Sequence, residues 1–187
     1  WIYSEVDAKM KDKVRFLIVG AGRGRTHVRS INALGDEFEL AGVVDLDIKR
    51  LHQLCDEEDI DYSRAYTSLE TVLQESFCDA VVVATWARTH EAIIRQVLES
   101  GANVLVEKPF TSTLKSAQRL LKSADANNLK IMVVQQWRYL AGQRTMRRLL
   151  GERRYGQPLV GHMFSYKARD GEYPDSSHSQ LWQMTVH

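Results

Sequence analysis

The sequence alternates short apolar segments with longer segments of helical periodicity, and this alternation constrains its fold more than any other feature. The apolar segments have strand length and are rich in β-branched residues, as at residues 80–84. We expect strands at residues 14–20, 38–44, 65–67, 80–84, 103–106 and 131–134, and helices at residues 26–34, 47–56, 68–74, 90–100 and 113–127. This order predicts an α/β fold with helices on both faces of a parallel sheet. Right-handed crossovers make the doubly wound Rossmann arrangement the expected topology.

The pattern changes near Trp137, where a second domain is expected to begin. We assign residues 12–136 to the Rossmann domain and residues 137–187 to the start of an α+β domain. A basic helix at residues 143–150 and a strand at residues 159–167 are expected there. A single strand would leave both of its edges unpaired. We therefore expect this second domain to be truncated and the chain to be a fragment.

Composition argues against several classes of function. The chain has 25 basic and 24 acidic residues with no basic stripe, so nucleic acid is not an expected partner. Its apolar runs are far shorter than the roughly 20 residues of a membrane span, so no membrane association is expected. Cys55 and Cys78 lack metal-ligand spacing, and no metal is expected. They indicate reduced thiols in the cytoplasm, with a disulfide between them as the lesser alternative.

A glycine-rich turn, Gly20-Ala-Gly-Arg-Gly-Arg25, follows the first strand. Gly20 permits a tight turn, and Gly22 lets the backbone approach phosphate groups. The following helix offers free N–H groups and the positive end of its dipole. Gly24 comes one position earlier than the third glycine of the common G-x-G-x-x-G pattern. The pattern predicts a dinucleotide pyrophosphate site at Gly20, Gly22, Arg23 and Gly24, against the alternative of an ordinary strand-to-helix turn.

Asp45 ends the second strand, 21 residues beyond Gly24. A carboxylate at this spacing accepts hydrogen bonds from the ribose hydroxyls of a dinucleotide and repels a 2′-phosphate, so NAD is the expected cofactor. NADP stays possible because four cationic side chains lie nearby in sequence: Arg23, Arg25, Lys49 and Arg50. For Lys49 and Arg50, solvated surface charge is the better interpretation.

A charged pair and a proline, Glu107-Lys108-Pro109, follow the strand at residues 103–106. Ligands of open parallel sheets bind at the carboxyl ends of the strands, so Lys108 is expected to point into the cofactor crevice. An ammonium group there can hydrogen-bond a substrate hydroxyl and stabilise its developing alkoxide. On the residues alone, a surface lysine in a strand-to-helix turn is equally consistent.

Together these segments resemble the glucose–fructose oxidoreductase / inositol dehydrogenase / MocA family. The resemblance runs from about Val14 to Val160 and is carried by Val19-Gly20-Ala21-Gly22, His27, Val43-Val44-Asp45, Ala84-Thr85 with His90, Val106-Glu107-Lys108-Pro109 and residues 132–139. It implies that Lys108 lies beside the nicotinamide and binds the reacting substrate, and that the Lys108–Pro109 peptide bond is cis.

The same resemblance implies further contacts. Cofactor contacts are expected at Thr85, Trp86, His90, Glu107 and Lys108, and substrate contacts at Lys108, Gln136 and Arg138. Trp86 either covers one face of the nicotinamide or packs within its loop. His90 is more consistent with a helix start than with a catalytic base.

The chain end, Gln183-Met-Thr-Val-His187, resembles the family's Asp-x-x-x-His motif, whose histidine takes part in proton transfer. On that resemblance His187 is the candidate base, since an imidazole titrates near neutral pH. Gln183 stands where the family has the aspartate. The alternative is that His187 has no catalytic role.

The resemblance implies an NAD(P)-dependent oxidoreductase that transfers hydride between nicotinamide and a secondary alcohol. The expected partner is a small-molecule sugar or polyol substrate, and the full-length protein is expected to form a homo-oligomer. Two alternatives stay open: a non-catalytic dinucleotide-sensing regulator, and an NAD-dependent glycosidase of the same fold.

Overall fold

The computed structural model describes residues 13–75, 78–160 and 162. The described residues fall into two units that divide between Val133 and Val134, and the domain boundary expected after residue 136 stays a prediction. In the first unit the strands are β1 (Val14–Val19), β2 (Phe38–Val44), β3 (Ala65–Tyr66), β4 (Ala80–Val83), β5 (Asn103–Val106) and β6 (Ile131–Val133). Its helices are α1 (Ala21–Ala33), α2 (Ile48–Glu58), α3 (Leu69–Gln74), α4 (Ala87–Glu99) and α5 (Leu114–Ala126), with a 3₁₀ turn η1 (Tyr62–Arg64).

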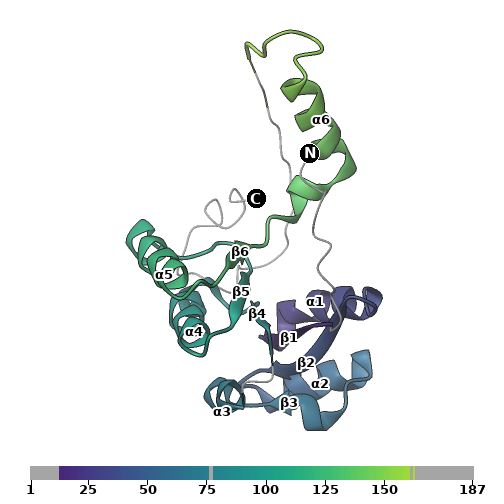
Figure 1. Ribbon diagram of the computed structural model, residues 1–187. Coiled ribbons are helices and arrows are strands. Elements are labelled where there is room, and N and C mark those ends of the chain that lie inside the picture. Colours follow the sequence, from purple (N-terminus) through teal and green to yellow (C-terminus); the bar gives the residue numbers. More distant parts are fainter. Residues whose placement is uncertain (1–12, 76–77, 161, 163–187) are drawn as a thin grey trace, which may run out of the picture. The chain divides into compact units, whose positions relative to one another are not determined.

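The strands form one parallel sheet in the order β3-β2-β1-β4-β5-β6 (Figure 1). The chain winds outward from β1 through β2 to β3, returns to the centre at β4, and winds outward again to β6. This is the doubly wound Rossmann topology, and the predicted fold class is confirmed.

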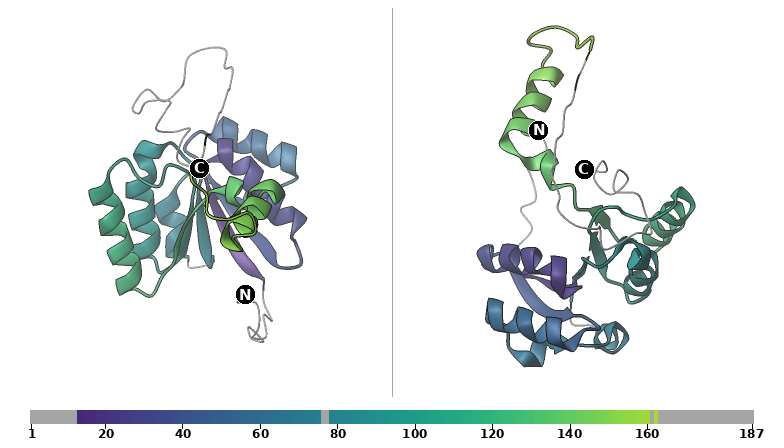
Figure 2. Two further views of the ribbon diagram at one scale, coloured as in Figure 1. Left: turned by 90° about the horizontal axis from the view of Figure 1, so that it is seen from above. Right: turned by 180° about the vertical axis from the view of Figure 1, so that it is seen from behind.

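Successive side chains of a strand point to opposite faces of the sheet, so the protein has two hydrophobic cores, one on each face. Leu17, Val19 and Val81 pack with buried residues of α3, α4 and α5. Their neighbours Ile18 and Val82 point to the opposite face and pack with α1 and α2. The left view of Figure 2 shows these two helical layers on either side of the strands. Each fully buried aliphatic side chain contributes about 1.5–3 kcal/mol, so both layers are held firmly to the sheet.

Helix α1 begins at Ala21, earlier than the predicted start near Thr26. Gly20 makes the turn alone with φ 103°, a backbone conformation that favours glycine, and a Cβ there would lie 2.7 Å from the Ala84 carbonyl oxygen. Gly24 therefore lies inside the helix. A Cβ on Gly24 would lie 2.5 Å from Cγ2 of Ile18, so this glycine allows α1 to pack closely on β1.

The starts of helices α4 and α3 can also be compared with the sequence. Helix α4 begins at Ala87 instead of His90, which places His90 within the helix. Ser68 caps helix α3, because its hydroxyl oxygen accepts a hydrogen bond from the Thr71 N–H at 3.3 Å.

The described part of the second unit contains the 3₁₀ turn η2 (Gln136–Tyr139) and helix α6 (Ala141–Gly151). Helix α6 includes the helix expected at residues 143–150. Residues 159 and 160 have no regular secondary structure, so the expected strand does not begin at Leu159. Residues 161 and 163–167 of that expectation lie outside the described residues.

The close contact at Gly24 gives a test of the packing of α1. We expect Gly24→Ala to lower the free energy of unfolding by about 1–3 kcal/mol, because the added methyl group overlaps Ile18. Gly22→Ala is the matched control. Its Cβ would meet only Cδ of Arg50, at 4.0 Å, and we expect a change within about 0.5 kcal/mol. Urea unfolding followed by far-ultraviolet circular dichroism measures both variants, and equal effects would contradict this account of the packing.

Candidate functional site

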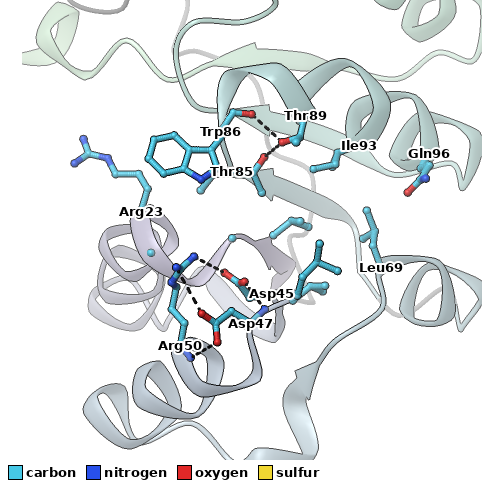
Figure 3. A pocket seen from close by; sticks show the side chains of 16 residues that line it. Arg23, Asp45, Asp47, Arg50, Leu69, Thr85, Trp86, Thr89, Ile93 and Gln96 are labelled. Carbon is cyan, nitrogen blue, oxygen red and sulfur yellow. Dashed lines mark hydrogen bonds and ion pairs between the residues drawn. The ribbon is translucent and has the colours of Figure 1, made fainter. Parts of the chain in front are cut away.

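A cavity of about 670 Å³ opens at the carboxyl ends of β1, β2 and β4 (Figure 3). Its volume is typical of small-molecule sites. It lies where the strand order reverses, which is the place where open α/β sheets bind ligands. The lining residues are Val19, Gly20, Gly22, Arg23, Val44, Asp45, Leu46, Asp47, Arg50, Leu69, Ala84, Thr85, Trp86, Thr89, Ile93 and Gln96.

The first turn of α1 meets the cavity at Gly22 and Arg23. Their N–H groups have no acceptor within the helix, because the first N–H groups of any α-helix precede its hydrogen-bonding ladder. A Cβ on Gly22 would meet no atom closer than 4.0 Å, so a ligand can approach the backbone here. Open donors at the positive end of the helix dipole fit a pyrophosphate group.

The Asp45 side chain is fixed by two backbone N–H groups. Its Oδ2 accepts from the Ala21 N–H at 2.8 Å, and its Oδ1 accepts from the Asp47 N–H at 2.9 Å. Each carboxylate oxygen has further lone pairs and can still accept from ribose hydroxyls. Because Asp45 is already held at the cavity wall, binding a ribose would require little further ordering of its side chain.

The arginines near the glycine turn have different partners. Arg50 is half-exposed, but it lines the cavity and its Nη1 lies 3.9 Å from Oδ2 of Asp45, so it is not simply a solvated surface charge. Arg23 also lines the cavity. Arg25 instead pairs with Glu57 at 2.7 Å, and this contact joins α1 to α2.

The start of α4 forms another wall of the cavity. The Thr89 hydroxyl donates to the Trp86 carbonyl oxygen at 2.8 Å, which leaves the Thr85 hydroxyl to donate to Oγ1 of Thr89, also at 2.8 Å. These bonds fix the turn between β4 and α4. Trp86 is 43% exposed and lines the cavity, so its indole offers a flat surface to a planar ring.

Glu107 lies buried at the end of β5 and is held by two side chains of α1. Its Oε1 accepts from Nε2 of His27 at 3.0 Å and from Nε of Arg23 at 3.4 Å. Burial by itself raises the pKa of this carboxyl. The hydrogen bond from His27 and the charges of Arg23 and His27 outweigh burial, so the pKa of Glu107 lies below its usual value. Glu107 thus anchors α1 to the strand that precedes Lys108.

Lys108 is partly buried, and its peptide bond to Pro109 is cis, as the resemblance implies. The neighbouring side chain of His90 is 0% exposed. Its Nδ1 lies 2.9 Å from the Pro109 carbonyl oxygen and its Nε2 lies 3.2 Å from the Thr85 carbonyl oxygen. Burial lowers the pKa of His90, although these two carbonyl groups oppose the shift. His90 therefore joins the segments that follow β4 and β5, and its ring does not line the cavity as expected for a direct cofactor contact.

The structure gathers six of the expected cofactor residues around the cavity: Gly20, Gly22, Arg23, Asp45, Thr85 and Trp86. Three other expected cofactor residues do not line the cavity but make contacts within the protein: Gly24 with β1, Glu107 with α1 and His90 with Pro109. Lys108 is also not among the lining residues. Other side chains that line the cavity were not predicted from the sequence: Leu46, Asp47, Leu69, Thr89, Ile93 and Gln96. The spacing of the last three, i, i+4 and i+7, puts them on one helix face and was the available signal.

The expected substrate residues belong to the second unit. Gln136 and Arg138 lie in η2, where Arg138 donates to Oε1 of Gln135 at 3.3 Å. His187 lies outside the described residues. The described part of the chain contains no group of three or more His, Cys, Asp or Glu residues that could hold a metal ion. The helices described there include none long and apolar enough to cross a membrane.

Comparison with known proteins assigns the chain to a family. The model of the oxidoreductase family with an NAD-binding Rossmann fold matches residues 14–135. The chain belongs to this family, whose Rossmann fold binds NAD.

Individual relatives agree with that assignment. The chain is 27% identical to inositol 2-dehydrogenase 3 of Saccharopolyspora erythraea, over 90% of the chain and 48% of the relative. It is 30% identical to an inositol 2-dehydrogenase of Acidiphilium cryptum, over 80% of the chain and 44% of the relative. The chain thus spans about half the length of these curated relatives. The solved structure of the WlbA dehydrogenase of Bordetella pertussis, in complex with NADH and UDP-GlcNAcA, matches with a TM-score of 0.72 at 28% identity, over 78% of this chain and 44% of that one.

The buried Glu107 cluster predicts a pH-dependent contribution to stability. A carboxyl whose folded-state pKa is depressed stabilises the fold above its unfolded pKa and loses that stabilisation as pH falls through the folded pKa. We expect Glu107→Gln to lower the free energy of unfolding by about 1.5–3 kcal/mol at pH 7, since a charged hydrogen-bonding group is lost. The deficit relative to wild type should shrink as the pH falls through the depressed pKa of Glu107 in the folded state.

The control for this measurement is Glu99→Gln, which removes an exposed ion pair with Arg95. Exposed ion pairs contribute about 0–1 kcal/mol, so the free energy of unfolding of this variant should depend on pH as that of the wild type does. Urea unfolding at a series of pH values checks both variants. A Glu107→Gln variant as stable as wild type at pH 7 would rule out the anchoring role.

Proposed function

We propose that the protein is an NAD-dependent dehydrogenase that transfers hydride between nicotinamide and a secondary alcohol of a sugar or polyol. The observation that carries this proposal is the cavity at the strand reversal, where the open N–H groups of α1 and the fixed Asp45 carboxylate lie together. The relatives named inositol 2-dehydrogenase support a cyclic polyol as the substrate class.

Different lining residues suit different parts of a dinucleotide. The N–H groups of Gly22 and Arg23 would bind the pyrophosphate, and Asp45 would accept from the adenosine ribose. Thr85 and Trp86, where α4 begins, would bound the nicotinamide half. When bound, the nicotinamide supplies the hydride acceptor or donor of the reaction.

Asp45 also supports a preference for NAD over NADP. Its carboxylate would repel a 2′-phosphate at the position where it accepts from a 2′-hydroxyl. Arg50 reduces that repulsion, because its guanidinium lies 3.9 Å from the carboxylate. We therefore expect the protein to bind NAD more tightly than NADP without excluding NADP entirely.

Lys108 is the proposed substrate-binding residue. The residues on either side of it are anchored, Glu107 by His27 and Pro109 by His90. An ammonium group on so fixed a backbone can hold the reacting hydroxyl and stabilise negative charge on its oxygen. His187 is proposed to accept the hydroxyl proton, with Gln183 in place of the family's aspartate. Substrate contacts by Gln136 and Arg138, a cytoplasmic location and a homo-oligomeric assembly stay predictions.

Calorimetric titration with NAD, NADH, NADP and NADPH tests the cofactor site. We expect wild type to bind NAD(H) more tightly than NADP(H). Asp45→Ala should weaken NAD binding by about 10- to 100-fold, the loss expected for hydrogen bonds to a charged group. Asp45→Asn keeps an acceptor for the Ala21 N–H but loses the charge, so it should mainly relax the exclusion of NADP. Asp36→Asn, in the exposed turn after α1, is the control, and a folded wild type that binds none of the four would overturn the proposal.

Turnover separates the dehydrogenase from its alternatives. With NAD and myo-inositol or related polyols, we expect net formation of NADH. Lys108→Met should reduce kcat/KM by roughly 100-fold, because it removes the charge that stabilises the developing alkoxide. Lys122→Met, an exposed position on α5, should have no effect. Release of a sugar leaving group without net NADH would favour the glycosidase, and NAD binding without turnover of any sugar or polyol would favour the regulator.

A further inference from the structure

The cavity is also lined by residues that follow β2, by the start of α3 and by one face of α4. Its wall there includes Leu46, Leu69, Ile93 and Gln96. The two halves of a dinucleotide lie on opposite sides of its pyrophosphate. With the pyrophosphate on α1 and the adenosine ribose at Asp45, the adenine base would enter this end of the cavity.

Three side chains of α4 follow one another along the cavity (Figure 3). Thr89, Ile93 and Gln96 occupy positions i, i+4 and i+7 and span about 10 Å at roughly 1.5 Å per residue. The Thr89 hydroxyl is engaged by the turn before α4. Ile93 offers only an apolar surface. The polar group left on this stripe is the carboxamide of Gln96.

Gln96 is exposed, and its carboxamide forms no side-chain hydrogen bond to any other residue in the described part of the chain. It therefore keeps one acceptor oxygen and an N–H₂ donor available to a ligand. The side chains around it, Leu69 and Ile93, are apolar and suit the faces of a flat ring. The charged side chains of the cavity have ionic partners: Arg50 lies near both Asp45 and Asp47, and Arg23 pairs with Glu107.

The chemistry of the carboxamide matches one edge of adenine. Adenine carries a donor, its 6-amino group, beside an acceptor, N7, and glutamine is a bidentate partner of that pair. We propose that Gln96 recognises the adenine base, with its carbonyl oxygen accepting from the 6-amino group and its N–H donating to N7. This inference rests on the proposed function, because it takes NAD as the ligand. It makes Gln96 a specificity-determining residue of the cofactor site.

Binding of a base-modified dinucleotide tests the assignment. Nicotinamide hypoxanthine dinucleotide carries an oxygen in place of the 6-amino group, so it presents two acceptors to Gln96. By calorimetric titration, we expect wild type to bind NAD about tenfold more tightly than this analogue, near the low end for a bidentate base contact. Gln96→Leu should lose about tenfold in NAD affinity, bind the analogue nearly as wild type does, and so lose the selectivity.

Two further variants complete the experiment. Gln96→Glu keeps an acceptor for the 6-amino group and should still prefer NAD to the analogue. Gln53→Leu makes the same change as Gln96→Leu on α2, outside the cavity lining, where Gln53 donates to Glu57. We expect it to leave both affinities unchanged.

The outcomes distinguish this inference from the function on which it rests. If Gln96→Leu binds NAD but keeps the wild-type selectivity, or if wild type binds both dinucleotides equally, the role of Gln96 is overturned and the proposed function stands. If folded wild type binds neither dinucleotide, both are overturned. Loss of selectivity in Gln96→Leu, with selectivity kept in Gln96→Glu, supports the assignment.

Discussion

The reversal of winding between β1 and β4 determines where this molecule can bind a ligand. Helices α1 and α4 leave these neighbouring strands toward opposite faces of the sheet, so neither covers the space above the carboxyl ends of the strands. Helix α1 packs closely on β1 beside this space. Gly24 allows that approach, because a Cβ there would overlap Ile18, and Gly20 makes the turn within a single residue.

Buried polar contacts fix the segments that surround this cavity. Asp45 holds the start of α1 to the end of β2, Glu107 holds α1 to the end of β5 through His27, and His90 lies between the carbonyl groups that follow β4 and β5. Burying polar groups is costly unless they are paired, and each of these groups has partners. These hydrogen bonds offset the cost of burial, and they hold the backbone around the site so that binding a ligand requires little further ordering.

The sequence predicted the sheet because its strands are short, β-branched and regularly spaced, and the order of elements left one natural topology. It placed the starts of α1 and α4 too late, because the turn at Gly20 takes one residue and no capping side chain marks the start at Ala87. The spacing of residues along the chain does not show which side chains are buried. His90 was therefore assigned to the cofactor, although its ring packs behind the site. Gln96 was missed, because its position on the cavity wall depends on the register of α4.

The central claim is that the pyrophosphate of a dinucleotide binds the first turn of α1. An amide nuclear magnetic resonance titration of the ¹⁵N-labelled chain with NAD tests it most directly, since each backbone N–H reports its own hydrogen bond. We expect the amide signals of Gly22 and Arg23 to shift most strongly, because their N–H groups gain phosphate acceptors, with smaller shifts around Asp45 and Thr85. Saturable NAD binding that leaves the Gly22 and Arg23 signals unmoved would contradict the claim and place the dinucleotide elsewhere.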